Sequence, residues 1–455
     1  MSQPADTKEG YVAGYRMLER QGAVPSWIPP LRLAALSCFR ELGYPTRHDE
    51  DWRFTPIGPI VDVPFKLPPR GAAAVERADV EHYMFEGAPR PELEERPAVD
   101  DSEFAAELVF VNGSFAPELS SRRALPAGVI VAPLAEALTS MPAAVEPNLA
   151  RHADFEHSVF AALNTAFLED GAFVRVEKGA ALERPIHLLY LSAEVEGPTV
   201  SHPRTLIVAE EASRLTVVES YASASAGHTF ANAVTEIVVE RAAKVDHVKL
   251  QQEAVTANHI GAMYVTMGHE SVFSSHSIAL GGAIARNEVY ARLAGERAEC
   301  TLNGLYLGDG KRLVDNHTSI DHAMPNCASH ELYRGILDGQ ARGVFNGKIM
   351  VRQDAQKTDA KQTNKTLLLS DRATIDTKPQ LEIFADDVKC THGATVGQLD
   401  AEALFYMRAR GIGLADARAM LTHAFASDVI QRIGLPALRE RLDGELLERL
   451  PKSAE

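Results

Sequence analysis

Apolar and polar residues alternate along much of the chain in short runs instead of long helical stripes. Between about residues 170 and 398, runs rich in β-branched residues are separated by turns that contain Gly, Asn, Asp or Ser. Such runs are typical of β-strands, and no long helical pattern interrupts them. We therefore expect this part of the chain to be built from strands.

A repeat runs through the strand-rich part. A polar turn residue, a small residue and then a strand recur about every 30 residues, with one longer step. A single unit of this kind cannot bury its own apolar face, whereas stacked units share a continuous core. The pattern favours a β-solenoid, and an antiparallel sandwich is the alternative. The repeat begins at Glu211, Glu240, Glu270, Glu296, Gln340 and Arg372.

Helical spacing precedes the strands. Residues 10–20 and 29–42 are predicted helices, and a Pro- and Glu-rich stretch near 87–102 is interpreted as a linker. Residues 107–115 read as a strand and a turn. The second helix is expected to bury Leu31, Ala35, Cys38 and Leu42 on one face.

Helical spacing returns after the strands. Asp400 is a plausible N-cap, and Gly411 ends the helix that it begins. Two further apolar stripes follow, and we expect them to dock on the scaffold or on a partner because a short helical tail cannot bury them alone. They consist of Leu414, Ala417, Leu421 and Phe425, and of Leu438, Leu442, Leu446 and Leu450.

Composition narrows the class of protein. The 455 residues carry a net charge of −16 and are 45% hydrophobic, which allows a large core and argues against a nucleic-acid binder. The first residues show no signal peptide, and no stretch of about 18 apolar residues predicts a membrane span. Four cysteines without a CxxC pair argue against a disulfide scaffold. A cytoplasmic protein is expected.

Cys390 and His392 are the most suggestive candidates for chemistry. Alternate residues of a strand share a face, so the thiol and the imidazole should point the same way, with Cα atoms about 7 Å apart. They could hold one metal or sulfur species, and an imidazolium would lower the thiol pKa. Packing roles are the alternative. Two ligands do not complete a metal site, so others must come from another chain. The adjacent Asp386 and Asp387 are interpreted as turn residues.

A second group of potential ligands follows no closed zinc motif, so structural histidines are the favoured interpretation. This group consists of His317, Asp321, His322, Cys327 and His330. The chain has no GxxxxGK[ST], GxSxG or HExxH motif and no GxGxxG opening a helix. We therefore expect ATP to be handled by a partner and the chain itself to be non-catalytic.

Three segments resemble a known family. Residues 354–400, DAQKTDAKQTNKTLLLSDRATIDTKPQLEIFADDVKCTHGATVGQLD, resemble the signature shared by SufB and SufD proteins of the SUF iron–sulfur cluster assembly system. Residues 406–430 are similar to the C-terminal helical region of those proteins. Residues 47–60, RHDEDWRFTPIGPI, resemble an N-terminal segment typical of the SufD branch.

The resemblance implies a mainly β fold, with a right-handed parallel β-helix core between helical N- and C-terminal regions. It implies an N-terminal region over 1–102, a β-helix over 103–399 with a helical insert near 133–168, and a C-terminal SufC-binding region over 400–455. It also implies a complex with SufB and the ATPase SufC. Cys390 and His392 would contribute to a nascent, transient iron–sulfur cluster at the SufB interface.

Several alternatives stay open. The chain could be a SufB-like paralogue, a β-helix carbohydrate-active enzyme with paired carboxylates, or a protein that stores or senses metal through the 317–330 histidines. A homodimer of the chain is possible when it is alone. Neither a resident cofactor on the isolated chain nor a nucleic-acid or membrane partner is expected. No role is assigned to Cys38, Cys300 and Cys327.

Overall fold

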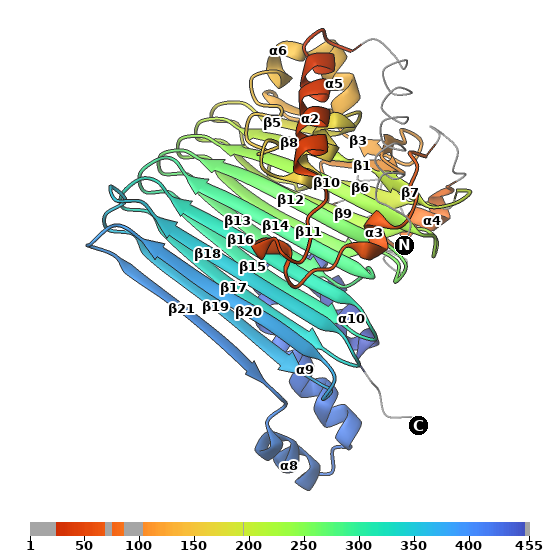
Figure 1. The fold of residues 1–455 in the computed structure, drawn as a ribbon, viewed down its shortest axis with the longest axis vertical. Coiled ribbons are helices and arrows are strands. Elements are labelled where there is room, and N and C mark those ends of the chain that lie inside the picture. The colour runs from red at the N-terminus through yellow and green to blue at the C-terminus, as the bar shows by residue number, and fades with distance from the viewer. Residues whose placement is uncertain (1–23, 69–74, 86–102, 194, 451–455) are drawn as a thin grey trace, which may run out of the picture.

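Two stacked, mainly parallel sheets form the body of the protein. The computed structural model describes residues 24–68, 75–85, 103–193 and 195–450. The chain passes from one sheet to the other and back, so each sheet grows by every second strand (Figure 1). The predicted parallel β-helix is confirmed, and the antiparallel sandwich is wrong.

The strands of the first sheet run in spatial order through β1 (Ala106–Val111), β6 (Ile186–Ser192), β9 (Arg214–Ser223), β11 (Lys244–Gln252), β13 (Val272–Ala279), β15 (Glu299–Gly308), β17 (Ala328–Leu337), β19 (Asp359–Leu368) and β21 (Lys389–Gly397). The short strands β2 (Ser114–Phe115) and β3 (Ser121–Arg122) pair with β1 in antiparallel fashion.

The second sheet runs through β4 (Val129–Pro133), β5 (Gly171–Val176), β8 (Arg204–Ala209), β10 (Thr229–Val239), β12 (Asn258–Met267), β14 (Ile284–Leu293), β16 (Leu313–His322), β18 (Arg342–Val351) and β20 (Thr374–Ile383). β7 (Thr199–Ser201) also pairs with β10, and β4 pairs with β5 in antiparallel fashion.

The repeat seen in the sequence marks the turns of the solenoid. Each strand of the first sheet from β9 to β19 begins two residues after a residue with positive φ, a left-handed conformation that lets the chain turn sharply. The first four repeat starts precede strands of the first sheet, whereas Gln340 and Arg372 precede strands of the second. This switch explains the one long step. The left-handed residues are Ala212, Ala242, Glu270, Arg297, Asn326 and Lys357.

Helices cover the beginning of the solenoid. The N-terminal ones are α2 (Ile28–Leu42), a 3₁₀ turn η1 (Glu50–Trp52), α3 (Gly58–Val61) and α4 (Arg77–Glu81), and the insert between β4 and β5 contains α5 (Leu134–Ser140), α6 (Pro142–Val145) and α7 (Val159–Ala166). The predicted helix 29–42 is confirmed, but its predicted buried face is wrong in part. Ala35 is buried as predicted and Leu42 is exposed. The helix also buries Leu36 and Phe39 against α7, and Ile28 and Arg32 elsewhere. Residues 10–20 and 87–102 lie outside the described part.

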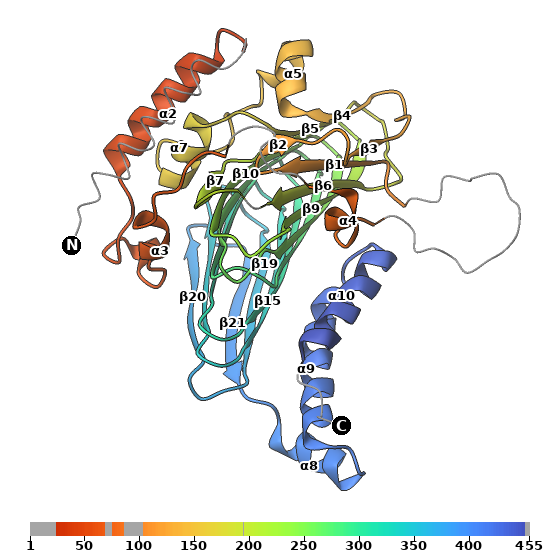
Figure 2. The ribbon, with the colours of Figure 1, turned by 90° about the vertical axis from the view of Figure 1, so that its right-hand side faces the viewer.

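Three helices follow the solenoid: α8 (Ala401–Ala409), α9 (Leu414–Ile430) and α10 (Pro436–Arg449). α9 and α10 lie along the outer face of the first sheet, and α8 lies beyond the end of the sheet (Figure 2). Asp400 caps α8 as predicted, accepting hydrogen bonds from the backbone N–H groups of Glu402 and Ala403. No helix in the described part of the chain is long and apolar enough to cross a membrane.

The apolar stripe of α10 is buried as predicted: Leu438, Leu442, Leu446 and Leu450 pack in one cluster with outward-facing residues of the first sheet, among them Val248 and Ile278. The stripe predicted for α9 is wrong in part. Leu414 is exposed, and α9 instead buries Ala426, Val429 and Ile430 against the same sheet.

Candidate functional site

The solenoid ends in a coil that nothing described covers. β20 and β21 are the last strands of the two sheets, and the end that they form lies farthest from α2 and α5 (Figure 1). Most interior positions of earlier coils are buried, whereas side chains on β20 and β21 are half-buried or exposed. Ile383, Phe384 and Val396 are apolar residues exposed at this end. The core of the solenoid is therefore open here.

Cys390 and His392 both face this open end. Their partners on β19 are Ala360 and Gln362, which are buried inside the solenoid. Residues in register on neighbouring parallel strands point to the same side, so Cys390 and His392 belong to the same interior face. Cys390 is half-buried beside Ile349 and Ala360. His392 is exposed because no further coil lies over it. The predicted shared face is confirmed.

The environment of Cys390 does not favour a thiolate in the isolated chain. Burial, and to a smaller extent the carboxylate of Asp359, raises the pKa of the Cys390 thiol above its ordinary value, although a hydrogen bond with the backbone of Ala360 works the other way. His392 is not among the groups that shift the pKa of the Cys390 thiol in this structure, so the lowering expected from an imidazolium stays a prediction. Activation of the thiol would require a cation or a metal from outside the chain.

Cys390 and His392 have no third ligand beside them. Among the described residues, no group of three or more His, Cys, Asp and Glu side chains could hold a metal ion. Asp387 forms an ion pair with Lys357 on the preceding coil, and Asp386 is exposed. Both lie in the turn before β21, as predicted, so neither completes a site with the pair.

The histidines between residues 317 and 330 do not meet. His317 lies on the outer face of the second sheet, His322 points into the solenoid and bonds Ser329, and His330 is exposed on the first sheet. Asp321 forms ion pairs with Arg352 and Arg292. The interpretation of structural histidines fits this placement, and the metal-storage alternative finds no support in it.

The other three cysteines are free thiols. Cys300 and Cys327 are buried in the solenoid core, and Cys38 is half-buried on α2. Burial raises the pKa of each of these thiols. The Cys327 thiol donates to the backbone oxygen of Gly295 at 3.3 Å. The burial of these three cysteines indicates that they serve in packing.

Two interior residues near the open end were not predicted. Gln362 lies in register beneath His392, and Glu331 lies beneath Gln362 on β17. The Gln362 amide donates a hydrogen bond of 2.7 Å to Glu331, and burial raises the pKa of Glu331 to about 7. Their positions, about 30 residues apart, are those that the repeat brings into one column.

Residues 47–54 form a second polar site on the outer face of the second sheet. The indole of Trp52 covers the buried guanidinium of Arg286 at 3.7 Å, and Arg286 forms 2.5 Å ion pairs with Glu288 and Asp315. Thr55 donates to Asp315. The SufD-like N-terminal segment is thus tied to β14 and β16 by its aromatic and hydroxyl side chains.

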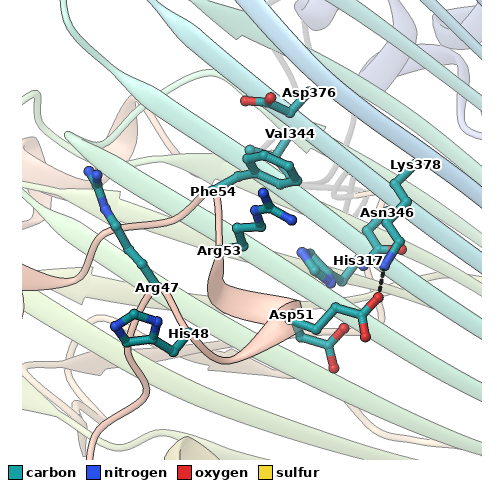
Figure 3. Close-up of a pocket in the computed structure, with 11 residues that line it drawn as sticks. Arg47, His48, Asp51, Arg53, Phe54, His317, Val344, Asn346, Asp376 and Lys378 are labelled. Carbon is teal, nitrogen blue, oxygen red and sulfur yellow. Dashed lines mark hydrogen bonds and ion pairs between the residues drawn. The ribbon is translucent and has the colours of Figure 1, made fainter.

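A cavity of about 620 Å³ lies between this segment and β16, β18 and β20 (Figure 3). Its carboxylates are largely neutralised, since Glu50 pairs with Lys378, and Asp376 pairs with Arg342. A glycoside hydrolase needs two carboxyl groups free to act on one bond. The cavity therefore gives the carbohydrate-enzyme alternative no support.

Comparison with known proteins agrees with the fold. The family model of the SUF system FeS cluster assembly SufBD core domain matches residues 190–425, and that of the SufBD protein N-terminal region matches residues 99–188. An iron–sulfur cluster assembly SufBD family protein of Synechocystis is 33% identical over 90% of this chain and 88% of its own length. The iron–sulfur cluster assembly protein SufD of Escherichia coli is 31% identical over 90% of both chains. The chain therefore belongs to the SufB/SufD family of iron–sulfur cluster assembly proteins.

Proposed function

We propose that this chain is the SufD-type scaffold subunit of a SufB–SufC–SufD complex, and that Cys390 and His392 act on a nascent iron–sulfur cluster at its interface with SufB. The observation that carries the proposal is the uncovered last coil, into which both side chains face. An open solenoid end exposes apolar interior and unpaired strand edges, and such ends are normally capped. A partner of similar fold would cover it.

The pair is suited to share a cluster and unsuited to hold one alone. Iron–sulfur clusters are usually held by four ligands, mostly thiolates, and this end of the chain offers one thiol and one imidazole. The cluster is cargo that is built and passed on, so an incomplete ligand set on each subunit would allow release. In the absence of SufB, the same end could pair with a second copy of the chain.

A different surface is proposed for SufC. The α10 stripe and the buried face of α9 are occupied by the first sheet, so they are not free for a partner. Four of the five large apolar residues exposed in the described C-terminal region instead lie on α8 and the first half of α9, namely Phe405, Tyr406, Leu414 and Met420, and the fifth is Leu447 on α10. We place the ATPase contact there, with ATP binding and hydrolysis in SufC. The chain itself would then be a non-catalytic subunit.

The proposal for the SufB interface is tested with His392→Ala in the reconstituted complex. We expect the variant complex to keep its composition on size exclusion and to lose cluster formation measured by absorbance. Cys390→Ser should do less harm, because thiolates can come from the partner. His330→Ala is the matched control, since this histidine is also exposed but lies on the outer face of the first sheet. Wild-type cluster formation by His392→Ala would refute the site.

A further inference from the structure

An unusual column of polar side chains runs through the interior beneath His392. Glu331, Gln362 and His392 occupy the same register position on β17, β19 and β21. Neighbouring strands of a sheet lie about 4.8 Å apart, so side chains in one column are in reach of one another. The preceding residue of the column is Leu302 on β15, which separates these three from the polar residues of earlier coils.

The side-chain amide of Gln362 is hydrogen-bonded on the β17 side and has an unpaired acceptor. It is 2% exposed, and its amide N–H donates to Glu331, which is 3% exposed. The amide oxygen of Gln362 has no hydrogen-bond partner among the residues that the structure describes. Leaving a buried acceptor unpaired costs about 1–3 kcal/mol, so such a group usually has a partner in the functional state. The next side chain in the column is the imidazole of His392, which can donate a ring N–H.

A glycine across the core makes room for this amide. A Cβ atom at Gly347 on β18 would lie 2.3 Å from the side-chain nitrogen of Gln362 and 2.8 Å from its carbonyl carbon. Both separations are far below van der Waals contact. The Gln362 amide therefore occupies space that only a glycine at position 347 leaves free. The Gly347 backbone limits the movement of the amide on one side, and the hydrogen bond to Glu331 restrains it on another.

We propose that Gln362, held by Glu331 and given its space by Gly347, is the positioning residue for His392. Its amide oxygen accepts the ring N–H nearer the solenoid, which fixes one tautomer and aims the other ring nitrogen outward at the cluster and the partner. Ligating histidines are commonly oriented by such a second hydrogen bond. The inference rests on the proposed role of His392.

Two variants test it. Gln362→Leu keeps much of the volume and removes the acceptor. Gly347→Ala keeps the Gln362 amide and displaces it, so it serves if the first variant folds poorly. The control is Asn364→Leu, because Asn364 is equally buried on the same strand but bonds Thr377 across the core and lies beneath Ala394.

The first readout is the NMR signal of the His392 ring nitrogens in the full chain. Gln362→Leu and Gly347→Ala should change its tautomer ratio, whereas Asn364→Leu should leave the ratio as in the wild type. The second readout is cluster formation in the complex, which we expect to slow at least tenfold in the two test variants and less than twofold in the control.

An unchanged His392 spectrum in Gln362→Leu would overturn the inference, as would equal slowing by Asn364→Leu. The role of His392 and the positioning role of Gln362 are distinguishable by these variants. If His392→Ala forms clusters normally, the proposed function is wrong. If His392→Ala fails and Gln362→Leu forms clusters normally, only the positioning role of Gln362 is wrong.

Discussion

Replacing Phe405 by alanine should weaken SufC binding without destabilising the chain. Phe405 lies on α8 and is 75% exposed, so the isolated chain gains little from its ring. A buried phenylalanine covers about 150–250 Å², and the exposed part of this ring would therefore contribute roughly 110–190 Å² to an interface. At about 25 cal/mol per Å², burial of that area is worth about 2.8–4.8 kcal/mol.

Ordering the side chain and imperfect packing reduce this value, and a loss of about 2–3 kcal/mol is a reasonable expectation. This loss corresponds to an about 30- to 150-fold increase in Kd. The assay is calorimetric titration of the purified chain with SufC, accompanied by denaturant unfolding of each variant. Leu447→Ala is the control, because Leu447 is 47% exposed on α10, outside the proposed contact.

We expect a raised Kd for Phe405→Ala, an unchanged Kd for Leu447→Ala, and unfolding midpoints near wild type for both. An affinity within twofold of wild type for Phe405→Ala would refute the placement of SufC on α8. Deletion of residues 401–455 is a poorer test of the SufC contact. The structure argues that the deletion would expose Val248, Ile278 and their neighbours, which α9 and α10 cover.

Three further predictions concern the scaffold and its chemistry. Leu442→Ala should lower the free energy of unfolding by about 2–5 kcal/mol, seen in denaturant titration, because the side chain is buried between α10 and the first sheet; no change would mean that α10 does not dock there. Asp315→Ala should cost about 3 kcal/mol at pH 7, because Arg286 loses a buried partner. The pKa of Asp315 is about 2 in the folded chain and about 3.9 when unfolded, so its contribution is complete above about pH 4 and the difference from wild type should shrink as the pH falls toward 2. Calorimetry should detect no micromolar ATP binding by the isolated chain, which has no phosphate-binding loop.

The solenoid could be predicted because its signal is repeated. Each coil needs a turn before its strand, and turns at Glu211, Glu240 and Glu270 are visible in the sequence. The sequence does not say whether a given turn precedes a strand of the first sheet or of the second. The turn at Glu296 precedes a strand of the first sheet, and the turn at Gln340 precedes a strand of the second. The two sets of turns can be told apart only in the folded structure, where the coils are stacked.

The faces of single helices were harder to predict than the solenoid. On α9, Leu414 fits a helical stripe as well as Ala426 does, but the outer face of the first sheet accepts Ala426 and leaves Leu414 exposed. Helix periodicity permits several neighbouring stripes, and the surface that the helix meets selects one. The stripe of α10 was predictable because its apolar residues are all leucines spaced four apart.

The site was predicted in part. Cys390 and His392 are two residues apart, and strand geometry alone places them on one face. Gln362 and Glu331 belong to other coils, and polar residues in a strand are ordinarily assigned to the solvent side. Their inward direction depends on a register between strands about 30 residues apart, which the sequence of one coil does not contain.

The position of the pair on the terminal coil also determines when the site becomes rigid. A strand inside the stack is hydrogen-bonded on both sides, whereas β21 is bonded only to β19. The backbone amides of β21 should therefore exchange with deuterium by local fraying, faster than those of β17, in the isolated chain. A partner seated on the open end would supply the missing neighbour and slow that exchange. The proposed cluster site would then become rigid only once the partner is bound. Exchange rates on β21 that are unchanged by SufB would contradict this coupling.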